Sequence, residues 1–133
     1  MQNKTNTQYQ YVTLGSLFVY KVSIELCDLG WNIYSSLNWQ NKKIMGDQFI
    51  KAVDSNAANI AEGYGRYYYL DRIKFYYNAR ASLLEAKHWA FLLSRRNIIS
   101  KTQFDNFLKQ ANHVHYNLNK FIQSCYITKD AKR

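Results

Sequence analysis

Residues 100–125 read SKTQFDNFLKQANHVHYNLNKFIQSC, and this stretch decides the class of fold. It opens on the capping box Ser100-Lys101-Thr102-Gln103, with Ile99 and Phe104 placed to form a hydrophobic staple around it. Apolar side chains then recur mostly three or four residues apart: Phe104, Phe107, Leu108, Ala111, Val114, Leu118, Phe121, Ile122 and Cys125. This periodicity predicts a long amphipathic helix with one buried face.

Two earlier segments show the same helical periodicity. One is expected from about Leu14 to Leu37, with an apolar stripe of Phe18, Val22, Leu26, Leu29, Ile33 and Leu37. The other is expected from about Asp47 to Glu62, with an apolar stripe of Ile50, Val53, Ala57 and Ile60. Asp47 is the predicted N-cap of this helix. Gly63 suits a left-handed residue after its end, and Gly65 marks the break.

The remaining helix, expected over residues 70–95, is apolar on two faces. One stripe consists of Ile73, Tyr77, Ala81, Leu84 and Phe91, and the other of Tyr76, Ala79, Leu83, Ala86, Ala90 and Leu93. A helix that is apolar on two sides needs two packing partners. Within a four-helix monomer one side is enough, so we expect the other side to contact a second subunit.

The fold class that follows is all-α, an antiparallel up-down-up-down four-helix bundle. Proline is absent and there are only five glycines, which favours a few long helices with short connections. We expect one domain over residues 13–127, with a polar loop at 38–43. Residues 1–12 are expected to form a flexible tail and residues 128–133 a frayed, charged one.

The charge is strongly unbalanced, with 18 basic against 9 acidic residues, a net charge of +9. Such a surface attracts nucleic acid, an acidic protein or an anionic membrane. No apolar run is long enough to span a bilayer, so we expect no membrane association. Cys27 and Cys125 have no framework spacing and indicate thiols in a reducing compartment. The predicted location is therefore the cytoplasm.

The sequence contains no constellation that indicates catalysis, a metal or a cofactor. A di-iron bundle needs two Glu-x-x-His motifs, and only one is present, Glu85 to His88. His113 and His115 are two residues apart, which points them in opposite directions on a helix. We expect one of them to face the core and the other the solvent.

The most unusual segment is 64–77, which interleaves six tyrosines with Arg66, Arg72 and Lys74. Aromatic rings can stack on unpaired bases while basic side chains neutralise phosphates. Tyrosine and arginine are also enriched at subunit contacts. The predicted oligomer-interface residues are Tyr67, Tyr68, Tyr69, Tyr76 and Leu83.

Basic residues are the better candidates for contacts with nucleic acid. The predicted set is Arg66, Arg72, Lys74, Arg80, Lys42, Lys43, Arg95 and Arg96. The doublets at 42–43 and 95–96 lie at expected loop positions, where ordinary solvation explains them equally well.

The stretch Ser55–Arg66, reading SNAANIAEGYGR, is followed by Asp71, Phe75, the run ARASL at 79–83 and Glu85. Together these residues resemble the signature of the 23S rRNA intervening-sequence protein family. The specific part is Asn59-Ile60-Ala61-Glu62-Gly63 with Gly65-Arg66. We expect this motif to be structural, because Arg66 can neutralise a helix end while Asn59 and Glu62 hold the turn by hydrogen bonds.

The resemblance implies a four-helix bundle without catalytic activity or cofactor. The family is similar to an accessory protein of diversity-generating retroelements, which forms a pentameric barrel and assists a reverse transcriptase. It therefore implies a homopentamer whose partner is RNA or a nucleic-acid-processing protein. The chain departs from the family pattern at Asn56-Ala57, usually Ile-Pro, at Tyr68, usually a small capping residue, and at Ala81, usually glycine.

Three functions remain open on these observations. The first is an oligomeric accessory protein that binds nucleic acid through a basic surface. The second is an interaction scaffold that binds an acidic protein without nucleic acid. The third, a bundle metalloenzyme, is disfavoured because the chain has only three glutamates.

Overall fold

The computed structural model describes residues 14, 15 and 17–131, and the side chains as far as Ile127. Its helices are α2 (Phe18–Ser36), α3 (Trp39–Asn41), the π-helix η1 (Lys42–Gly46), α4 (Asp47–Tyr64), α5 (Tyr69–Arg95) and α6 (Lys101–Ala131). The expected tail at 1–12 lies outside the described residues. Residues 128–131, expected to fray, continue α6 as helix.

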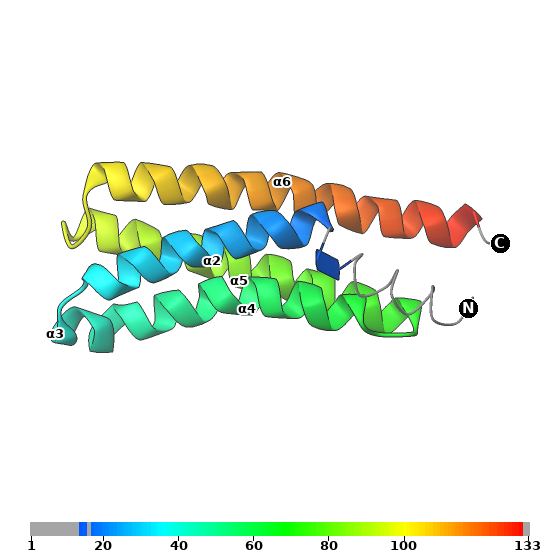
Figure 1. Cartoon of the computed structure of the whole chain (residues 1–133), viewed down its shortest axis with the longest axis horizontal. Coiled ribbons are helices and arrows are strands. Elements are labelled where there is room, and N and C mark those ends of the chain that lie inside the picture. Colours follow the sequence, from blue (N-terminus) through cyan, green and yellow to red (C-terminus); the bar gives the residue numbers. More distant parts are fainter. Residues whose placement is uncertain (1–13, 16, 132–133) are drawn as a thin grey trace.

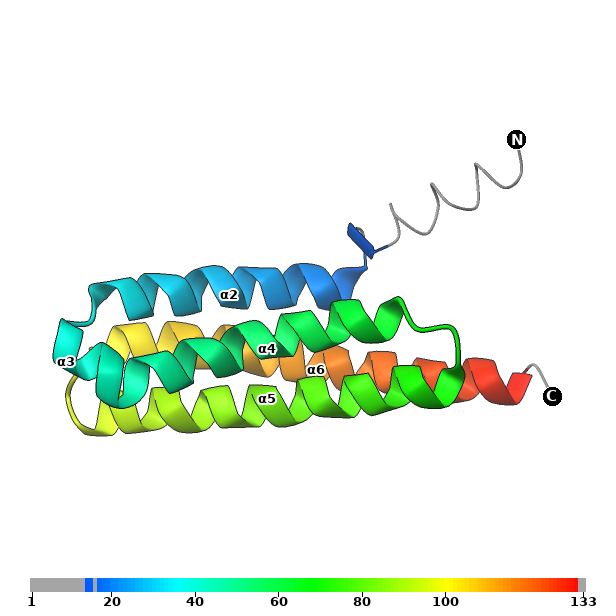
Figure 2. The same ribbon diagram turned by 90° about the horizontal axis from the view of Figure 1, so that it is seen from below.

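The four long helices pack as an antiparallel bundle, which confirms the predicted fold class (Figures 1 and 2). In the described part of the chain, α4 packs on α2 and α5, and α6 packs on α2 and α5. The helices therefore form a square in which α2 lies diagonally from α5. The α2–α4 layer is one side of the molecule and the α5–α6 layer is the opposite side.

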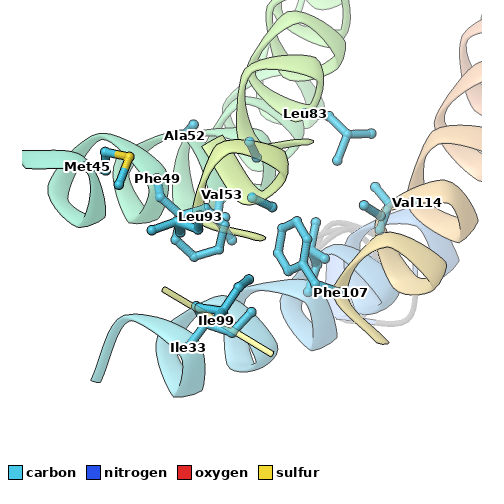
Figure 3. Packing of buried hydrophobic residues seen from close by; sticks show 14 of the residues in the cluster. Ile33, Met45, Phe49, Ala52, Val53, Leu83, Leu93, Ile99, Phe107 and Val114 are labelled. Carbon is cyan, nitrogen blue, oxygen red and sulfur yellow. The ribbon is translucent and has the colours of Figure 1, made fainter. Parts of the chain in front are cut away.

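The core runs the length of the bundle and is built largely from the predicted stripes, although Phe49, which was not assigned to a stripe, is completely buried and Ile50 is only half-buried. Figure 3 shows its larger part, where Phe49 of α4 packs against Phe107 of α6 with ring centroids 5.1 Å apart. The predicted residues Val22, Leu26 and Ile33 of α2 are buried, as is Leu37 directly after it, whereas Leu29 is half-buried and Phe18 is exposed. Phe18 instead meets the ring of His113 edge-on, 5.7 Å away.

The predicted loop at residues 38–43 is wrong. Only Leu37 and Asn38 break the helix, and α3, η1 and α4 then follow without interruption. Asn38 begins this segment, because its Oδ1 accepts from the backbone N–H of Asn41 at 2.8 Å. Asp47 is not an N-cap, since the chain is already helical there, and its Oδ1 accepts from Tyr34 Oη at 2.7 Å.

Gly63 is not left-handed either. It lies inside α4, and among the described residues only Asn97 has a positive φ, of 58°. A Cβ at Gly63 would stand 2.7 Å from Cε1 of Tyr76, so the missing side chain lets α4 and α5 approach closely. The turn comes two residues later, where Gly65 caps α4 by donating to the carbonyl of Ala61 at 3.2 Å.

The two apolar faces of α5 are present as predicted, but they divide unequally. The stripe from Tyr76 to Leu93 is buried in the core, and Tyr77, Ala81, Leu84 and Phe91 are exposed. Ile73 was assigned to the stripe of Tyr77 and Leu84 but is in fact buried. Tyr76 and Leu83 are completely buried within the monomer, so their prediction as oligomer-interface residues is wrong.

The capping box of α6 is confirmed in both directions. Ser100 Oγ accepts from the N–H of Gln103 at 3.1 Å, and Gln103 Oε1 accepts from the N–H of Ser100 at 2.9 Å. These bonds satisfy N–H groups that the first turn of a helix leaves without partners. The start of α6 is therefore defined locally, at the position that the sequence indicates.

Candidate nucleic-acid interface

Two basic doublets that are far apart in the sequence lie at the same end of the bundle. Figures 1 and 2 both show α3 and the α5–α6 turn at this end, opposite the α4–α5 turn. The guanidinium Nη1 of Arg96 lies 2.9 Å from Sδ of Met45 in η1, which joins the two segments directly. We call the surface formed by Trp39, Lys42, Lys43, Arg95 and Arg96 the basic end.

The α5–α6 turn holds its shape through the backbone. The N–H of Ile98 donates to the carbonyl of Leu93 at 2.9 Å, and Asn97 takes the left-handed conformation between them. Helices commonly end with such a hydrogen bond around a residue in the left-handed conformation, which asparagine adopts more readily than most residues. Arg95 and Arg96 stand immediately before this reversal, and both are exposed.

Aromatic rings lie among the cations of the basic end. Trp39 is 74% exposed, and Nζ of Lys43 lies 5.1 Å from the centroid of its ring. Nζ of Lys42 lies at the same distance from the ring of Tyr34, whose hydroxyl is tied to Asp47. An exposed tryptophan beside a lysine combines a stacking surface with a charge for phosphate.

The charge at the basic end is predominantly positive. Residues 38–47 and 94–105 contain five basic side chains and two acidic ones, Asp47 and Asp105, a net charge of +3. In the α4–α5 turn, residues 62–74 contain Arg66, Arg72 and Lys74 together with Glu62 and Asp71, a net charge of +1. The segments of the basic end therefore attract a phosphate backbone more strongly than the α4–α5 turn does.

The other predicted arginines are engaged within the monomer. Arg66 Nη2 lies 3.6 Å from Oε1 of Glu62, and its guanidinium lies 4.7 Å from the ring of Phe75. Arg80 donates to Oδ1 of Asn119 at 2.9 Å and stacks on Tyr77. Arg72 is half-buried, and Lys74 is exposed on α5.

The tyrosines of the α4–α5 turn separate into two kinds. Tyr67 and Tyr68 are largely exposed and meet edge-on, 5.2 Å apart. Tyr69 is half-buried and meets Tyr126 of α6, 6.0 Å away. Tyr68 is the N-cap residue of α5 and makes no side-chain capping hydrogen bond. This agrees with the departure from the family pattern, which usually has a small capping residue at this position.

The residues of the family-like motif make contacts inside the monomer. The expectation that Asn59 holds the turn is wrong, because its Nδ2 donates to the carbonyl of Ser55 at 2.8 Å, within α4. Glu62 pairs with Arg66 across the end of α4, and Gly63 permits the close approach of α5. Ala81 is exposed and lies at no helix contact inside the monomer.

The cysteine, glutamate and histidine side chains considered in the sequence have identifiable surroundings in the described part of the bundle. Burial, together with the charge of Asp54, raises the pKa of Cys27 to about 12, which keeps this thiol protonated and unreactive. Glu85 accepts from Nε1 of Trp89 at 3.1 Å. His115 is half-buried against Lys87 of α5, and His113 is exposed beside Phe18 of α2, so the two lie on different sides of α6. Neither is buried in the core, as one of them was expected to be.

Neither a metal cluster nor a membrane span is found in the part of the chain that the structure describes. No three histidine, cysteine, aspartate or glutamate side chains there come close enough together to hold a metal ion. Among the described helices, none is both long and apolar enough to cross a bilayer.

A hollow of about 730 Å³ adjoins the basic end at the α5–α6 turn. Its lining consists of Ser94, Asn97, Ile98, Ile99, Ser100, Lys101, Phe104 and Asp105. Lys101 and Asp105 pair with each other at 3.2 Å, so the charges in this lining compensate one another.

Comparison with known proteins places the chain in a family. The model of the 23S rRNA-intervening sequence proteins matches residues 15–120. The chain belongs to this family. The match covers α2 to most of α6, and it includes both segments of the basic end.

A solved structure shares the fold of this family member. It is a protein of unknown function from the S23 ribosomal protein family of Bacteroides thetaiotaomicron, with a TM-score of 0.73 and 25% sequence identity. The similarity covers 78% of this chain and 97% of that one. No curated protein matches the chain.

Sequence reasoning missed the aromatic part of the basic end. Trp39 and Tyr34 lie on either side of the helix break, and the expected loop concealed their relation to Lys42 and Lys43. The signal that could have found them is the composition of residues 39–43, WQNKK, in which a tryptophan precedes two lysines. Their proximity to Arg95 and Arg96 depends on the packing of the bundle.

Proposed function

We propose that this family member is a non-enzymatic, self-associating accessory protein that binds single-stranded RNA, or another single-stranded nucleic acid, at its basic end. The observation that carries the proposal is the presence of Lys42, Lys43, Arg95 and Arg96 at one end of the bundle, where Arg96 contacts Met45 of η1 and Lys43 lies beside the exposed ring of Trp39. The exposed apolar residues of α5 support the self-association.

The chemistry of the basic end favours a single strand over a duplex. Lysine and arginine neutralise phosphates and release condensed counterions, which gives affinity without regard to sequence. Trp39 adds a flat apolar surface on which an unpaired base can stack. In a duplex the base faces are already stacked on one another, so only the phosphate contacts would remain.

Fluorescence anisotropy with a labelled single-stranded RNA, at increasing salt, tests the proposal. Four phosphate contacts predict that log K falls with log salt with a slope of about −3. The same RNA annealed to its complement should bind more weakly at each salt concentration.

A pair of double variants separates the basic end from net charge alone. Lys43→Ala with Arg95→Ala removes two of the proposed contacts, and the slope should become shallower by about 1.4. Lys109→Ala with Lys120→Ala removes the same charge from exposed positions of α6 and should leave the slope nearly unchanged.

Equal losses in the two double variants would contradict a localised site. Absence of binding even at low salt would overturn the proposal and would instead favour an acidic protein as the partner of the basic end.

A further inference from the structure

A row of exposed apolar side chains runs along α5. Leu70, Tyr77, Leu84 and Phe91 are spaced seven residues apart, and they are 74%, 39%, 52% and 49% exposed, respectively. Side chains at this spacing lie along one line of a helix and can pack into the surface of another helix. Large apolar side chains that are exposed together mark a surface that another molecule covers.

Contacts to α6 place this row on the outer surface of the α5–α6 layer. The Tyr77 hydroxyl hydrogen-bonds the hydroxyl of Tyr126, and the Phe91 ring meets Phe104 with centroids 6.5 Å apart. Ala81 lies on the same exposed side of α5, where a methyl group allows another backbone to come close. We call the surface carrying the row the α5–α6 face.

The opposite side of the bundle has its own exposed apolar pair. Ile24 and Trp31 of α2 are also seven residues apart, and they are 37% and 57% exposed. Trp31 stacks on Tyr34, 5.5 Å away, and Tyr34 in turn bonds Asp47 of α4. These residues therefore lie on the outer surface of the α2–α4 layer, which we call the α2–α4 face.

The two layers carry charge of opposite sign. Helices α2 and α4 contain five acidic and two basic side chains, and with Lys42 and Lys43 of the adjoining η1 this layer has a net charge of −1. The described side chains of α5 and α6 include eight basic and three acidic ones, a net charge of +5. The acidic side includes the exposed Asp28 and Asp54, and the basic side includes the exposed Lys74 and Arg95.

From this polarity we infer that the α5–α6 face of one copy docks on the α2–α4 face of the next. The contact brings the apolar row against Ile24 and Trp31 and brings net charges of opposite sign together. The symmetric alternative, α5–α6 face against α5–α6 face, would set two basic layers against each other. The inference rests on the self-association proposed above and specifies its geometry.

A contact between two different faces has a direct consequence for assembly. After pairing, one copy still has a free α2–α4 face and the other a free α5–α6 face, so further copies add until the assembly closes into a ring or else continue as an open filament. A contact between identical faces would stop at a dimer.

Sedimentation velocity of single variants and of their mixture, without nucleic acid, tests the inference. Leu84→Glu disables the α5–α6 face, and Ile24→Glu disables the α2–α4 face. Each variant alone should be monomeric, whereas the wild-type protein assembles. An equimolar mixture should form a 1:1 dimer, because each variant still has the face that the other has lost.

Two controls test whether added charge alone, or unfolding, causes the loss of assembly. Asn78→Glu adds the same charge at an exposed position of α5 outside the row, and it should assemble like the wild type. Circular dichroism should report the same helix content for every variant, since Ile24 and Leu84 are exposed. The two monomeric variants should have similar Tm values, and any decrease relative to the assembled wild type should be shared by both.

The outcomes distinguish the interface from the function on which it rests. Assembly of Ile24→Glu like the wild type, or failure of the mixture to pair, would overturn the interface and leave self-association standing. A wild-type protein that sediments as a monomer would overturn both. Nucleic-acid binding is measured separately, through residues of the basic end.

Discussion

Gly63 of α4 faces the buried ring of Tyr76 of α5 so closely that a Cβ on the glycine would stand 2.7 Å from the ring carbon Cε1. It would also lie 2.9 Å from Cβ of Phe75. Tyr76 is completely buried and has little freedom to move away. The close packing of α4 on α5 at this end therefore depends on a residue without a side chain.

Gly63→Ala should lower the free energy of unfolding by about 1–3 kcal/mol, the usual cost of inserting a methyl group into a well-packed contact. Urea denaturation followed by circular dichroism measures this change. The matched control is Gly65→Ala, whose Cβ would come no closer than 3.6 Å to a neighbouring atom, at a φ of −81°. It should be neutral or stabilising by up to about 1 kcal/mol. Equal destabilisation by both would contradict this account of Gly63.

Asn56→Asp should destabilise the bundle strongly, because Asn56 is fully buried and its Nδ2 donates to the carbonyl of Ala79 at 2.9 Å. A carboxylate there would face an acceptor without a proton to donate, at a cost of about 3 kcal/mol or more. Burial raises the pKa of such a carboxyl, so the loss should grow as pH rises and the group ionises. Denaturation at two pH values checks this, with the exposed Asn78→Asp as control. A loss independent of pH would argue against ionisation as its cause.

Acidification should destabilise the protein partly through His115. Burial, and then the charges of Lys87 and Arg80, lowers the pKa of His115 below its ordinary value. Lys87 Nζ lies 2.9 Å from Nδ1, and because an ammonium can only donate, this nitrogen must be unprotonated. As pH falls below about 6.5, the unfolded chain therefore takes up a proton that the folded histidine does not. The free energy of unfolding then decreases.

His115→Gln should remove this part of the pH dependence. Unfolding free energies of the variant and the wild type, measured by denaturation at about pH 7.5 and about pH 5.5, bracket the ordinary titration of histidine. The difference between the two pH values should be smaller in the variant. His88→Gln, at an exposed position of α5, is the control and should retain the wild-type difference. An unchanged difference in His115→Gln would exclude this histidine as a source.

Trp39→Ala should weaken binding of single-stranded RNA by about 1–3 kcal/mol, the range for a base stacked on an aromatic side chain. Anisotropy at constant salt measures the loss, and binding of the duplex should change much less. Tyr116→Ala is a matched control, because Tyr116 is 62% exposed and has Lys120 Nζ 5.3 Å from its ring centroid, yet lies on α6 away from the basic end. Equal losses of affinity in the two variants would mean that any exposed aromatic–lysine pair contributes to RNA binding, and would contradict a site localised at the basic end.

Much of the fold follows from local patterns in the sequence. The start of α6 was predicted correctly because Ser100 and Gln103 bond each other's backbone over three residues. The stripes of α2 and α4 were also identified, since helical periodicity reports the buried face directly. Local patterns failed at residues 38–46, where polarity indicated a loop. There α3 and η1 continue into α4 because Met45 and Gly46 are buried against the rest of the bundle.

The basic residues of the candidate site were predicted from the sequence, but its aromatic residues were not. The doublets at 42–43 and 95–96 were among the predicted contacts, together with Arg66 and Arg80, which the fold engages in intramolecular pairs. The pair of Arg66 with Glu62, four residues before it, could be read from the sequence, whereas the bond of Arg80 to Asn119 joins two helices and depends on their packing.

The sequence by itself therefore determined that four amphipathic helices form, since spacing and capping act within a few residues. It could not determine which apolar face of α5 is buried, because the Tyr76 and Tyr77 stripes are both long enough to make a core. Packing against α4, with Gly63 beneath Tyr76, chose the first stripe and left Tyr77, Leu84 and Phe91 exposed. The antiparallel arrangement then brought residues 42–43 and 95–96 to one end, because proximity between distant segments arises only from the tertiary structure.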